Sequence, residues 1–237
     1  MNPLLPYFGQ VPMFAALPEE TQKKLERIAE QRQYRRRQVV HFADQAGDFV
    51  YLLCSGRVKV SRVSEQGREV TLYLIEGNQI FGETGLVAEN QPYELMAETL
   101  EDSLVAVFRR NDIIAALNEN PKAAAEMLNL VSERRSQAET AVADLVFLDV
   151  PKRLAKLLLR LHDAHGSKAS KTGTLIKAKF THQELANMIG STRETTTLIL
   201  NDFKRHGSID FTGRKIVVRS RTELEDILRG PARSSAA

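Results

Sequence analysis

Two neighbouring groups of hydroxyl and carboxylate residues near the C-terminus have the spacing of helix starts. Thr181-His-Gln-Glu184 places a glutamate three residues after a threonine, and Ser191-Thr-Arg-Glu194 repeats the pattern ten residues later. A hydroxyl at the N-cap and a carboxylate three residues on form a capping box, because each accepts a hydrogen bond from a backbone N–H at the helix start. With Gly190 between them, the two predicted helices form a helix-turn-helix.

The second predicted helix, which runs to about His206, has two faces. Its inner face, which we expect to pack on the first helix, comprises Thr196, Ile199, Leu200 and Phe203. Its outer face carries Arg193, Glu194, Thr197 and Asn201. An arginine there can bind guanine through two hydrogen bonds, and a glutamate can accept one from the cytosine amino group. We therefore predict that this face contacts DNA bases.

Four further predicted DNA-binding residues flank this face: Ser191, Thr192, Lys204 and Arg205. Of these, Thr192, Lys204 and Arg205 are predicted to contact phosphates. After the second helix, residues 208–211 and 215–219 are predicted to form two strands around Gly213. Such a β-hairpin is typical of the wing of a winged helix-turn-helix. Paired short helices also occur in proteins that bind no DNA, so the prediction needs support from the rest of the chain.

Charge is divided unevenly along the 237 residues. Residues 151–237 hold 17 Lys and Arg against 8 Asp and Glu, a balance of +9, whereas residues 1–150 hold 16 against 22, a balance of −6. The asymmetry favours a polyanion-binding C-terminal domain that follows an acidic one. Charge alone would equally fit a solvated surface or an anionic membrane, so it supports the DNA prediction and does not carry it.

Composition argues against several other classes of protein. No apolar run approaches the roughly 18 residues that span a bilayer, and the N-terminus lacks the features of a signal peptide, so we expect a cytoplasmic protein with no membrane partner. The single cysteine, Cys54, cannot form an internal disulfide or a four-thiolate cluster. We find no Gly-rich phosphate loop, metal-ligand spacing or nucleophile motif, and therefore predict no enzyme, no metal site and no cofactor.

From Val39 to about Phe108 the sequence has the texture of short strands. Predicted strands cover 49–54, 57–63, 70–75 and 104–108, and turn signals separate them. Many short strands at near-regular spacing indicate a small antiparallel barrel or roll. A short helix is predicted before them, over 18–31.

After Pro121 the periodicity lengthens, and a helix is predicted to continue without Gly or Pro to Phe147. One of its faces follows a 3-4-3-4-3 spacing, with the members Leu128, Val131, Arg135, Ala138, Val142 and Leu145. This heptad seam fits two structures about equally well, a helix lying across its own β domain and a two-helix dimer seam. A second helix is predicted over 151–162, and the polar stretch 165–173 is predicted to be an exposed loop.

Taken in order, these segments resemble the Crp/Fnr superfamily of transcription regulators. The residues that carry the resemblance are Gly47-Asp48, Ser55-Gly-Arg-Val-Lys-Val60, Phe81-Gly-Glu83 with Gly85, Phe147-Leu-Asp-Val-Pro-Lys-Arg-Leu154, Thr181-His-Gln-Glu-Leu-Ala186 and Gly190-Ser-Thr-Arg-Glu-Thr195. Together they are highly specific, although each piece alone is weak. The resemblance implies an α+β fold: an N-terminal antiparallel β-roll of the cyclic-nucleotide-binding type, a long dimerisation helix and a C-terminal winged helix-turn-helix.

The resemblance also implies a division of the chain and a set of partners. We expect an effector-type β-roll over 1–120, a dimerisation helix over 121–148, a DNA-binding domain over 149–230 and a disordered tail over 231–237. The dimer interpretation of the seam is favoured, with a hinge near 148–151, and the implied target of the homodimer is a palindromic site on double-stranded DNA. Because some relatives touch RNA polymerase at the place of residues 165–173, the polymerase is a further expected partner.

Departures from cyclic-nucleotide-binding relatives concern the predicted effector pocket, which comprises Gly82, Glu83, Tyr93 and Glu94. The Arg-Ser pair that holds the cyclic phosphate in such relatives falls on Tyr93-Glu94, and their base-contacting hydroxyl pair falls on Ala138-Glu139. Burying a phosphate without a cation is costly. We therefore predict a regulator that does not depend on cyclic AMP, unless Arg57 or an Arg135 supplied by a second copy replaces the missing cation. The effector is not identified.

Three further points concern a bound cofactor, the DNA half-site and the competing function. An iron–sulfur sensor needs more cysteines than Cys54, whereas haem binding at His41, His162 or His165 is not excluded, although the last two are more simply polar helix-end residues. Leu198 stands where many relatives have a further base-reading arginine, so we expect the DNA half-site to differ at that base. A module that senses a small ligand and controls a protein partner is the competing function.

Overall fold

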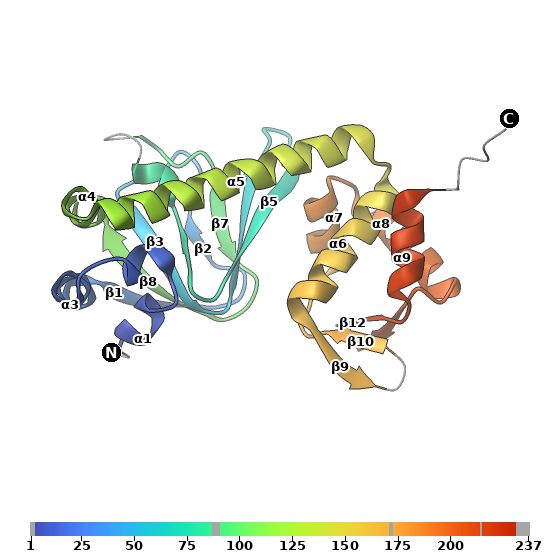
Figure 1. The fold of residues 1–237 in the computed structure, drawn as a ribbon. Helices are drawn as coiled ribbons and strands as arrows, with labels where there is room; N and C mark the ends of the chain where they lie inside the picture. The colour runs from blue at the N-terminus through green and yellow to red at the C-terminus, as the bar shows by residue number, and fades with distance from the viewer. Residues whose placement is uncertain (1–2, 87–90, 171–172, 214, 231–237) are drawn as a thin grey trace, which may run out of the picture. The chain divides into compact units, whose positions relative to one another are not determined.

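The computed structural model describes residues 3–86, 91–170, 173–213 and 215–230 (Figure 1). The chain forms two compact units, residues 1–139 and 140–237, and the boundary falls inside one long helix. The tail predicted to be disordered, 231–237, lies outside the described residues. Helices and antiparallel sheets both contribute, which confirms the α+β class.

From residue 3 onward, three short helices precede the first strand: α1 (Leu5–Phe8), α2 (Pro12–Ala15) and α3 (Glu19–Ile28). The rings of Phe8 and Phe14 stack 4.3 Å apart and both contact Phe108, which anchors these helices to the first unit. The prediction of a helix as far as residue 31 was wrong. Ala29 leaves the helix with extended backbone angles, and Glu30 begins strand β1 (Glu30–Tyr34), because pairing with a distant strand satisfies its backbone groups.

Within the described residues, the first unit contains two four-stranded antiparallel sheets with the orders β1-β8-β3-β6 and β2-β7-β4-β5. Their remaining strands are β2 (Val39–His41), β3 (Phe49–Ser55), β4 (Arg57–Val63), β5 (Glu69–Glu76), β6 (Gln79–Phe81), β7 (Met96–Thr99) and β8 (Ser103–Arg109). The four predicted strands are β3, β4, β5 and β8. Strands β1, β2, β6 and β7 were not predicted from the sequence.

Strand β3 explains how the first unit is layered. Val50, Leu52 and Cys54 belong to a core shared with the N-terminal helices, whereas Tyr51 and Leu53 point into a second core inside the roll. Successive strand residues face opposite sides, so an uninterrupted apolar run is expected for a strand covered on both faces. Helices cover one face of this sheet and the second sheet covers the other.

Two helices follow the roll, α4 (Arg110–Glu119) and α5 (Pro121–Phe147). The bounds of α5 are those that the sequence predicts. Within the first unit, α5 buries Ala123, Met127 and Arg134. The short 3-10 turn η1 (Glu83–Leu86) lies directly after β6.

The second unit packs helices around a small sheet of the order β11-β12-β10-β9. Its elements after α5 are α6 (Val150–His165), β9 (Gly166–Ser170), β10 (Gly173–Ile176), α7 (His182–Ile189), α8 (Arg193–Arg205), β11 (Ile209–Thr212), β12 (Lys215–Val218) and α9 (Arg221–Arg229). The predicted apolar face of α6 is buried: Leu154, Leu157, Leu158 and Leu161. The hairpin of β11 and β12 confirms the predicted wing.

The prediction of an exposed loop over 165–173 was wrong. Helix α6 continues to His165, and β9 then pairs antiparallel with β10, with Gly166 opposite Ile176. Strand β10 also pairs with β12. The polar sequence suggested no strand, whereas backbone hydrogen bonds to a neighbouring strand hold β9 in the sheet. Residues 171 and 172 lie outside the described part.

Candidate nucleic-acid interface and effector site

Helix α7 begins with the capping box that the sequence predicts. The Thr181 hydroxyl accepts a hydrogen bond from the Glu184 backbone N–H at 3.1 Å, and the Glu184 carboxylate accepts one from the Thr181 N–H at 2.7 Å. Leu185, Ala186 and Ile189 are buried behind it. The helix is therefore fixed at its start and along its inner side.

The turn between α7 and α8 depends on Gly190, which has the left-handed angles φ 59° and ψ 49°. Glycine is favoured here by conformation, and a Cβ would lie 2.7 Å from Cδ2 of Leu145, so that side chain would have to shift to admit one. The prediction of a second capping box at 191–194 was wrong. Thr192 is the N-cap, its hydroxyl accepts from the Thr195 N–H at 3.2 Å, and α8 begins one residue later because Gly190 and Ser191 complete the turn.

The two faces of α8 separate as the sequence predicts. Thr196, Leu200 and Phe203 are buried and Ile199 is partly buried. Arg193, Glu194 and Asn201 are exposed, Thr197 is partly buried, and Leu198 is 71% exposed. At 100° per residue, positions 193, 197 and 201 follow one line along the helix. The predicted base-contacting residues Arg193, Glu194, Thr197 and Asn201 thus share one outer face with Leu198. We call these five residues the reading face.

The basic residues at the end of α8 already have carboxylate partners. Lys204 Nζ lies 3.4 Å from the Asp210 carboxylate, which Arg219 also binds, and Arg205 pairs with Asp202. The hydrogen bond from Arg219 lowers the pKa of Asp210 to about 2. Exposed ion pairs are weak and exchange readily. Lys204 and Arg205 are therefore held at the edge of α8 while remaining available to a phosphate.

His182, at the start of α7, lies against the reading face and was missed by the sequence analysis. Its Nδ1 is 2.8 Å from Oγ1 of Thr197, and its ring lies beside that of Phe211 in β11. The sequence offered one sign of a structural role for His182, namely its position immediately after the predicted N-cap, Thr181. Which residue of α8 it would meet depends on how the two helices cross, which the local sequence does not state.

In the roll, the ring of Tyr93 occupies part of the inner core. Tyr93 is fully buried. Its ring centroid lies 4.0 Å from that of His41, with the two rings stacked, and 6.2 Å from that of Tyr51. Its hydroxyl donates to the Phe49 carbonyl at 2.6 Å and accepts from the Phe49 N–H at 3.2 Å. Tyr93 is thus an anchored member of the inner core, a role that its polar hydroxyl and large ring both suit.

Glu83, the first residue of η1, is only 5% exposed. Its neighbours are Tyr73 of β5 and Arg134 of α5, and the Arg134 guanidinium lies 4.5 Å above the Tyr73 ring. Burial raises the pKa of the Glu83 carboxyl, although Arg134 and Tyr73 counteract part of this effect. Within the described residues, Glu83 Oε2 and Arg134 Nε have no hydrogen-bond partner. Arg134 is a buried cation that the sequence analysis did not assign to this site.

The structure does not bring all four predicted effector residues together. Gly82 packs against the Tyr51 ring, where a Cβ would lie at 2.8 Å, and Glu83 and Tyr93 are buried. Glu94 is exposed and pairs with Arg62 at 3.2 Å. The carboxylate expected in the phosphate position therefore points to solvent rather than into the roll.

His41 lies among aromatic rings, and burial lowers its pKa to about 4. His162 instead hydrogen-bonds Asp163 at 3.0 Å. In the part of the chain that is described, no group of three or more His, Cys, Asp or Glu side chains could hold a metal ion. No described helix is both long and apolar enough to cross a membrane.

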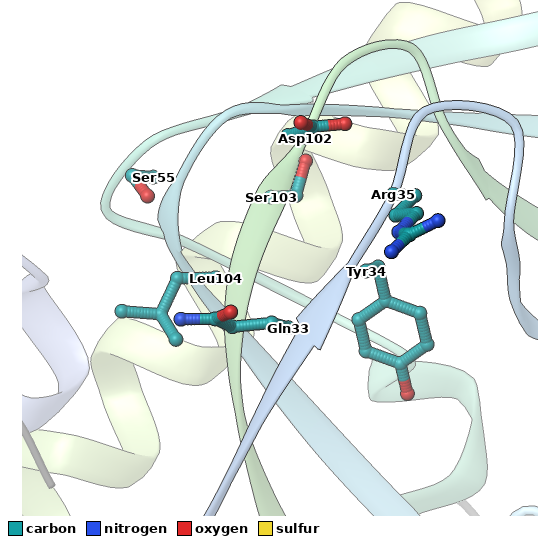
Figure 2. Close-up of a pocket in the computed structure, with 7 residues that line it drawn as sticks. All are labelled: Gln33, Tyr34, Arg35, Ser55, Asp102, Ser103 and Leu104. Atoms are coloured by element: carbon teal, nitrogen blue, oxygen red, sulfur yellow. The ribbon is translucent and has the colours of Figure 1, made fainter.

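A pocket of about 480 Å³ opens at a different place in the first unit, beside the paired strands β1 and β8 (Figure 2). Its lining residues are Gln33, Tyr34, Arg35, Ser55, Asp102, Ser103 and Leu104. In Figure 2 the Tyr34 ring and the Leu104 side chain point in different directions, and the polar groups do not converge on one point. None of the predicted effector residues lines this pocket.

In comparison with known proteins, each of the two units matches a family domain. Residues 31–120 match the cyclic nucleotide-binding domain, and residues 152–227 match the Crp-like helix-turn-helix domain. The chain is 34% identical over 194 residues to the global nitrogen regulator of a Nostoc species, which covers 81% of this chain and 86% of that protein. It is 29% identical over 181 residues to a CRP-like cAMP-activated global transcriptional regulator of Mycobacterium tuberculosis, with coverages of 76% and 80%.

The fold is shared with solved structures of low sequence identity. A c-di-GMP-responsive global regulator from Xanthomonas campestris superposes with a TM-score of 0.74 at 22% identity, covering 86% of this chain and 100% of that one. The helix-turn-helix geometry, the two domain matches and the curated relatives agree. The chain belongs to the Crp/Fnr family and is a DNA-binding transcription regulator of that type.

Proposed function

We propose that the protein binds a palindromic DNA site as a homodimer and reads each half-site with α8. The observation that carries this proposal is the reading face, which exposes Arg193 and Glu194 in the first turn of a helix whose opposite face is buried. Side chains in the first turn of such a helix reach base edges in the major groove. Ser191 flanks this face as a further DNA-binding residue, and Thr192, Lys204 and Arg205 supply phosphate contacts.

The test of DNA recognition is a genome-wide binding experiment, with the motif extracted from the bound fragments and verified by mobility shift. The expected motif is a near-palindrome with a G·C step under Arg193 and Glu194. Discrete complexes with the motif, and none with a shuffled sequence, are expected. A protein that forms no discrete complex with any genomic fragment would instead be a ligand-sensing module that acts on a protein partner.

The homodimer is proposed to form through α5. Its seam residues are largely solvent-exposed within the single chain, with Leu128 67% and Val142 61% exposed, and Ala138 is small enough for close approach of two helices. Exposed apolar residues at heptad spacing are typical of a coiled-coil surface. A second copy of the same helix is the partner that this spacing fits.

Independence from cyclic AMP is the third part of the proposal. The two positions that would supply the phosphate ligands hold Tyr93, whose ring is locked in the core, and Glu94, which faces solvent. The nearby cation, Arg134, already lies over Tyr73 and beside Glu83. Calorimetry on nucleotide-free protein should detect no micromolar binding of cyclic AMP and no gain in operator affinity. Tight binding with a matching gain in affinity would contradict this part alone.

Contact with RNA polymerase is proposed for the β9–β10 hairpin, in place of the loop expected from the sequence. The support is the resemblance, since some relatives touch the polymerase at the corresponding place. A variant with a shortened hairpin should bind the operator as the wild type does but lose its effect on transcription with purified polymerase. An unchanged transcriptional effect would move the contact elsewhere.

A further inference from the structure

His182 joins three elements at the edge of the reading face. It is the first residue of α7, its Nδ1 lies 2.8 Å from Thr197 Oγ1 in α8, and its ring centroid lies 6.2 Å from that of Phe211 in β11. Thr197 stands between Arg193 and Asn201 on the line that we expect to face DNA. A change at His182 therefore reaches the reading face through one hydrogen bond.

The positions of the hydrogen atoms in this contact follow from the number of donors and acceptors that each group has. The Thr197 hydroxyl lies 2.8 Å from the Arg193 carbonyl oxygen and donates its only hydrogen there. Thr197 Oγ1 can then only accept from His182, so Nδ1 carries a hydrogen. In the neutral imidazole this fixes the tautomer, with the proton on Nδ1 and a lone pair on Nε2.

The charges around the ring favour its neutral form. Burial and the Arg193 guanidinium both lower the pKa of His182 below its ordinary value. A further charged group, Lys204, lies over the ring of Phe211, with its Nζ 5.7 Å from the ring centroid. Glu184 of the same helix is engaged with the Thr181 N–H. His182 thus serves near neutral pH as an uncharged hydrogen-bond donor.

A fixed hydroxyl also fixes the methyl group on the same carbon. The χ1 angle of a threonine in a helix is divided between two rotamers, because the hydroxyl bonds the preceding turn in one of them. At Thr197 the hydroxyl is held between the Arg193 carbonyl and His182 Nδ1. The methyl group, which makes no hydrogen bond, is then held in a single direction from Cβ.

We propose that His182 is a positioning residue that locks Thr197, so that the Thr197 methyl group recognises the 5-methyl group of a thymine in each half-site. The inference rests on the proposed DNA-reading role of α8. Methyl-to-methyl contact is an established way to read thymine in the major groove. His182 itself need not touch DNA for this effect.

The experiment replaces each thymine of the selected operator by uracil, which removes only the 5-methyl group. For the wild type, one position per half-site should weaken binding by about fourfold, the value of one buried methyl-sized group. Thr197→Ser, which keeps the hydroxyl but lacks the methyl, should lose this thymine-to-uracil difference at that position alone.

The test of His182 uses three variants of the same chain. His182→Ala should reduce the thymine-to-uracil difference to near unity, and His182→Asn should restore it, because an asparagine amide can place an N–H near the position of Nδ1. His182→Gln, whose amide extends toward the position of Nε2, should not restore it. Thermal unfolding and binding to non-specific DNA serve as controls for folding.

Two failures have separate meanings. If the wild type selects no operator, the proposed function fails. If the wild type selects one but His182→Ala retains the full thymine-to-uracil difference, or if Asn and Gln restore it equally, the positioning role fails while the DNA-binding role remains. If His182→Ala does not fold, the comparison of the Asn and Gln variants decides between the same outcomes.

Discussion

At the scale of single residues, a substitution at Arg193 distinguishes sequence-specific binding from non-specific binding to DNA. Its side chain is exposed in the first turn of α8 and has no salt bridge among the described residues. Arg193→Ala should weaken binding to the selected operator by about 1–3 kcal/mol, because a guanidinium–guanine contact is lost, and should hardly affect non-specific DNA. Titrations on both DNAs measure the difference.

Lys204→Ala is the matched control for Arg193→Ala. Because we expect Lys204 to contact phosphate, its removal should weaken both kinds of binding similarly and flatten the dependence on salt. An unaltered preferred sequence after Arg193→Ala would show that another face of the helix reads the bases.

His41 links the stability of the first unit to pH. Its folded pKa is about 4, below the ordinary value of 6.5, because it is buried among aromatic rings. The unfolded chain therefore binds the proton first, and stability present above pH 6.5 is lost as the pH falls toward 4, by up to about 3 kcal/mol. Denaturant unfolding at several pH values measures this slope.

The variant His41→Phe should remove most of the slope while keeping an aromatic ring in the cluster. His206→Gln is the control, since His206 is exposed at the end of α8 and its side chain is 65% accessible. A slope that persists unchanged in His41→Phe would assign the pH dependence to other groups.

At the scale of elements, the apolar seam of α5 sets the oligomeric state. Val131 is exposed on this face in the single chain. Val131→Asp would place two like charges in a dimer interface, so we expect a monomer that has lost most of its operator affinity. Sedimentation velocity measures the change, with Glu133→Gln, on a different side of the helix, as the control. Wild-type sedimentation of Val131→Asp would place the dimer contact elsewhere.

The elements that could be predicted are those whose own residues indicate their secondary structure. The bounds of α5 follow from Pro121 and from an uninterrupted periodicity, and β4 follows from its alternation between two turns. Strand β1 has the polar sequence Glu-Gln-Arg-Gln-Tyr and becomes a strand only because β8, some 70 residues later, pairs with it. Strand β9, which is also polar, was likewise not predicted; it pairs with β10, which in turn pairs with the distant β12. Such pairings depend on tertiary structure, which a single sequence does not state.

The candidate site divides in the same way. The outer face of α8 is a property of one helix, so the exposed Arg193, Glu194 and Asn201 could be identified from spacing alone. The contacts of His182 with Thr197 and of Arg134 with Tyr73 and Glu83 join different elements. Their positions along the chain contain no sign of the partner, and only the folded structure supplies it.

At the scale of the whole molecule, two copies of the reading face require two half-sites at a fixed separation. The centres should lie about one helical turn, or 10–10.5 base pairs, apart or a multiple of that distance. Inserting about five base pairs rotates one half-site to the opposite side of the duplex, so affinity should fall to that of a single half-site. Mobility shifts on the spaced operators measure this. Affinity that is indifferent to the insertion would point to independent monomers.

The close approach of Leu145 to Gly190 has a practical consequence for anyone who dissects this protein. Arg153 donates to the Leu145 carbonyl at 3.2 Å and Lys156 pairs with Asp144 at 2.6 Å, so the last two turns of α5 are packed onto the DNA-binding unit. A recombinant fragment that starts at Asp149, where sequence similarity would suggest a cut, leaves the surface at Gly190 uncovered and Lys156 without its carboxylate. A fragment that starts near Thr140 keeps both, and is the one to use for spectroscopy on the isolated DNA-binding unit.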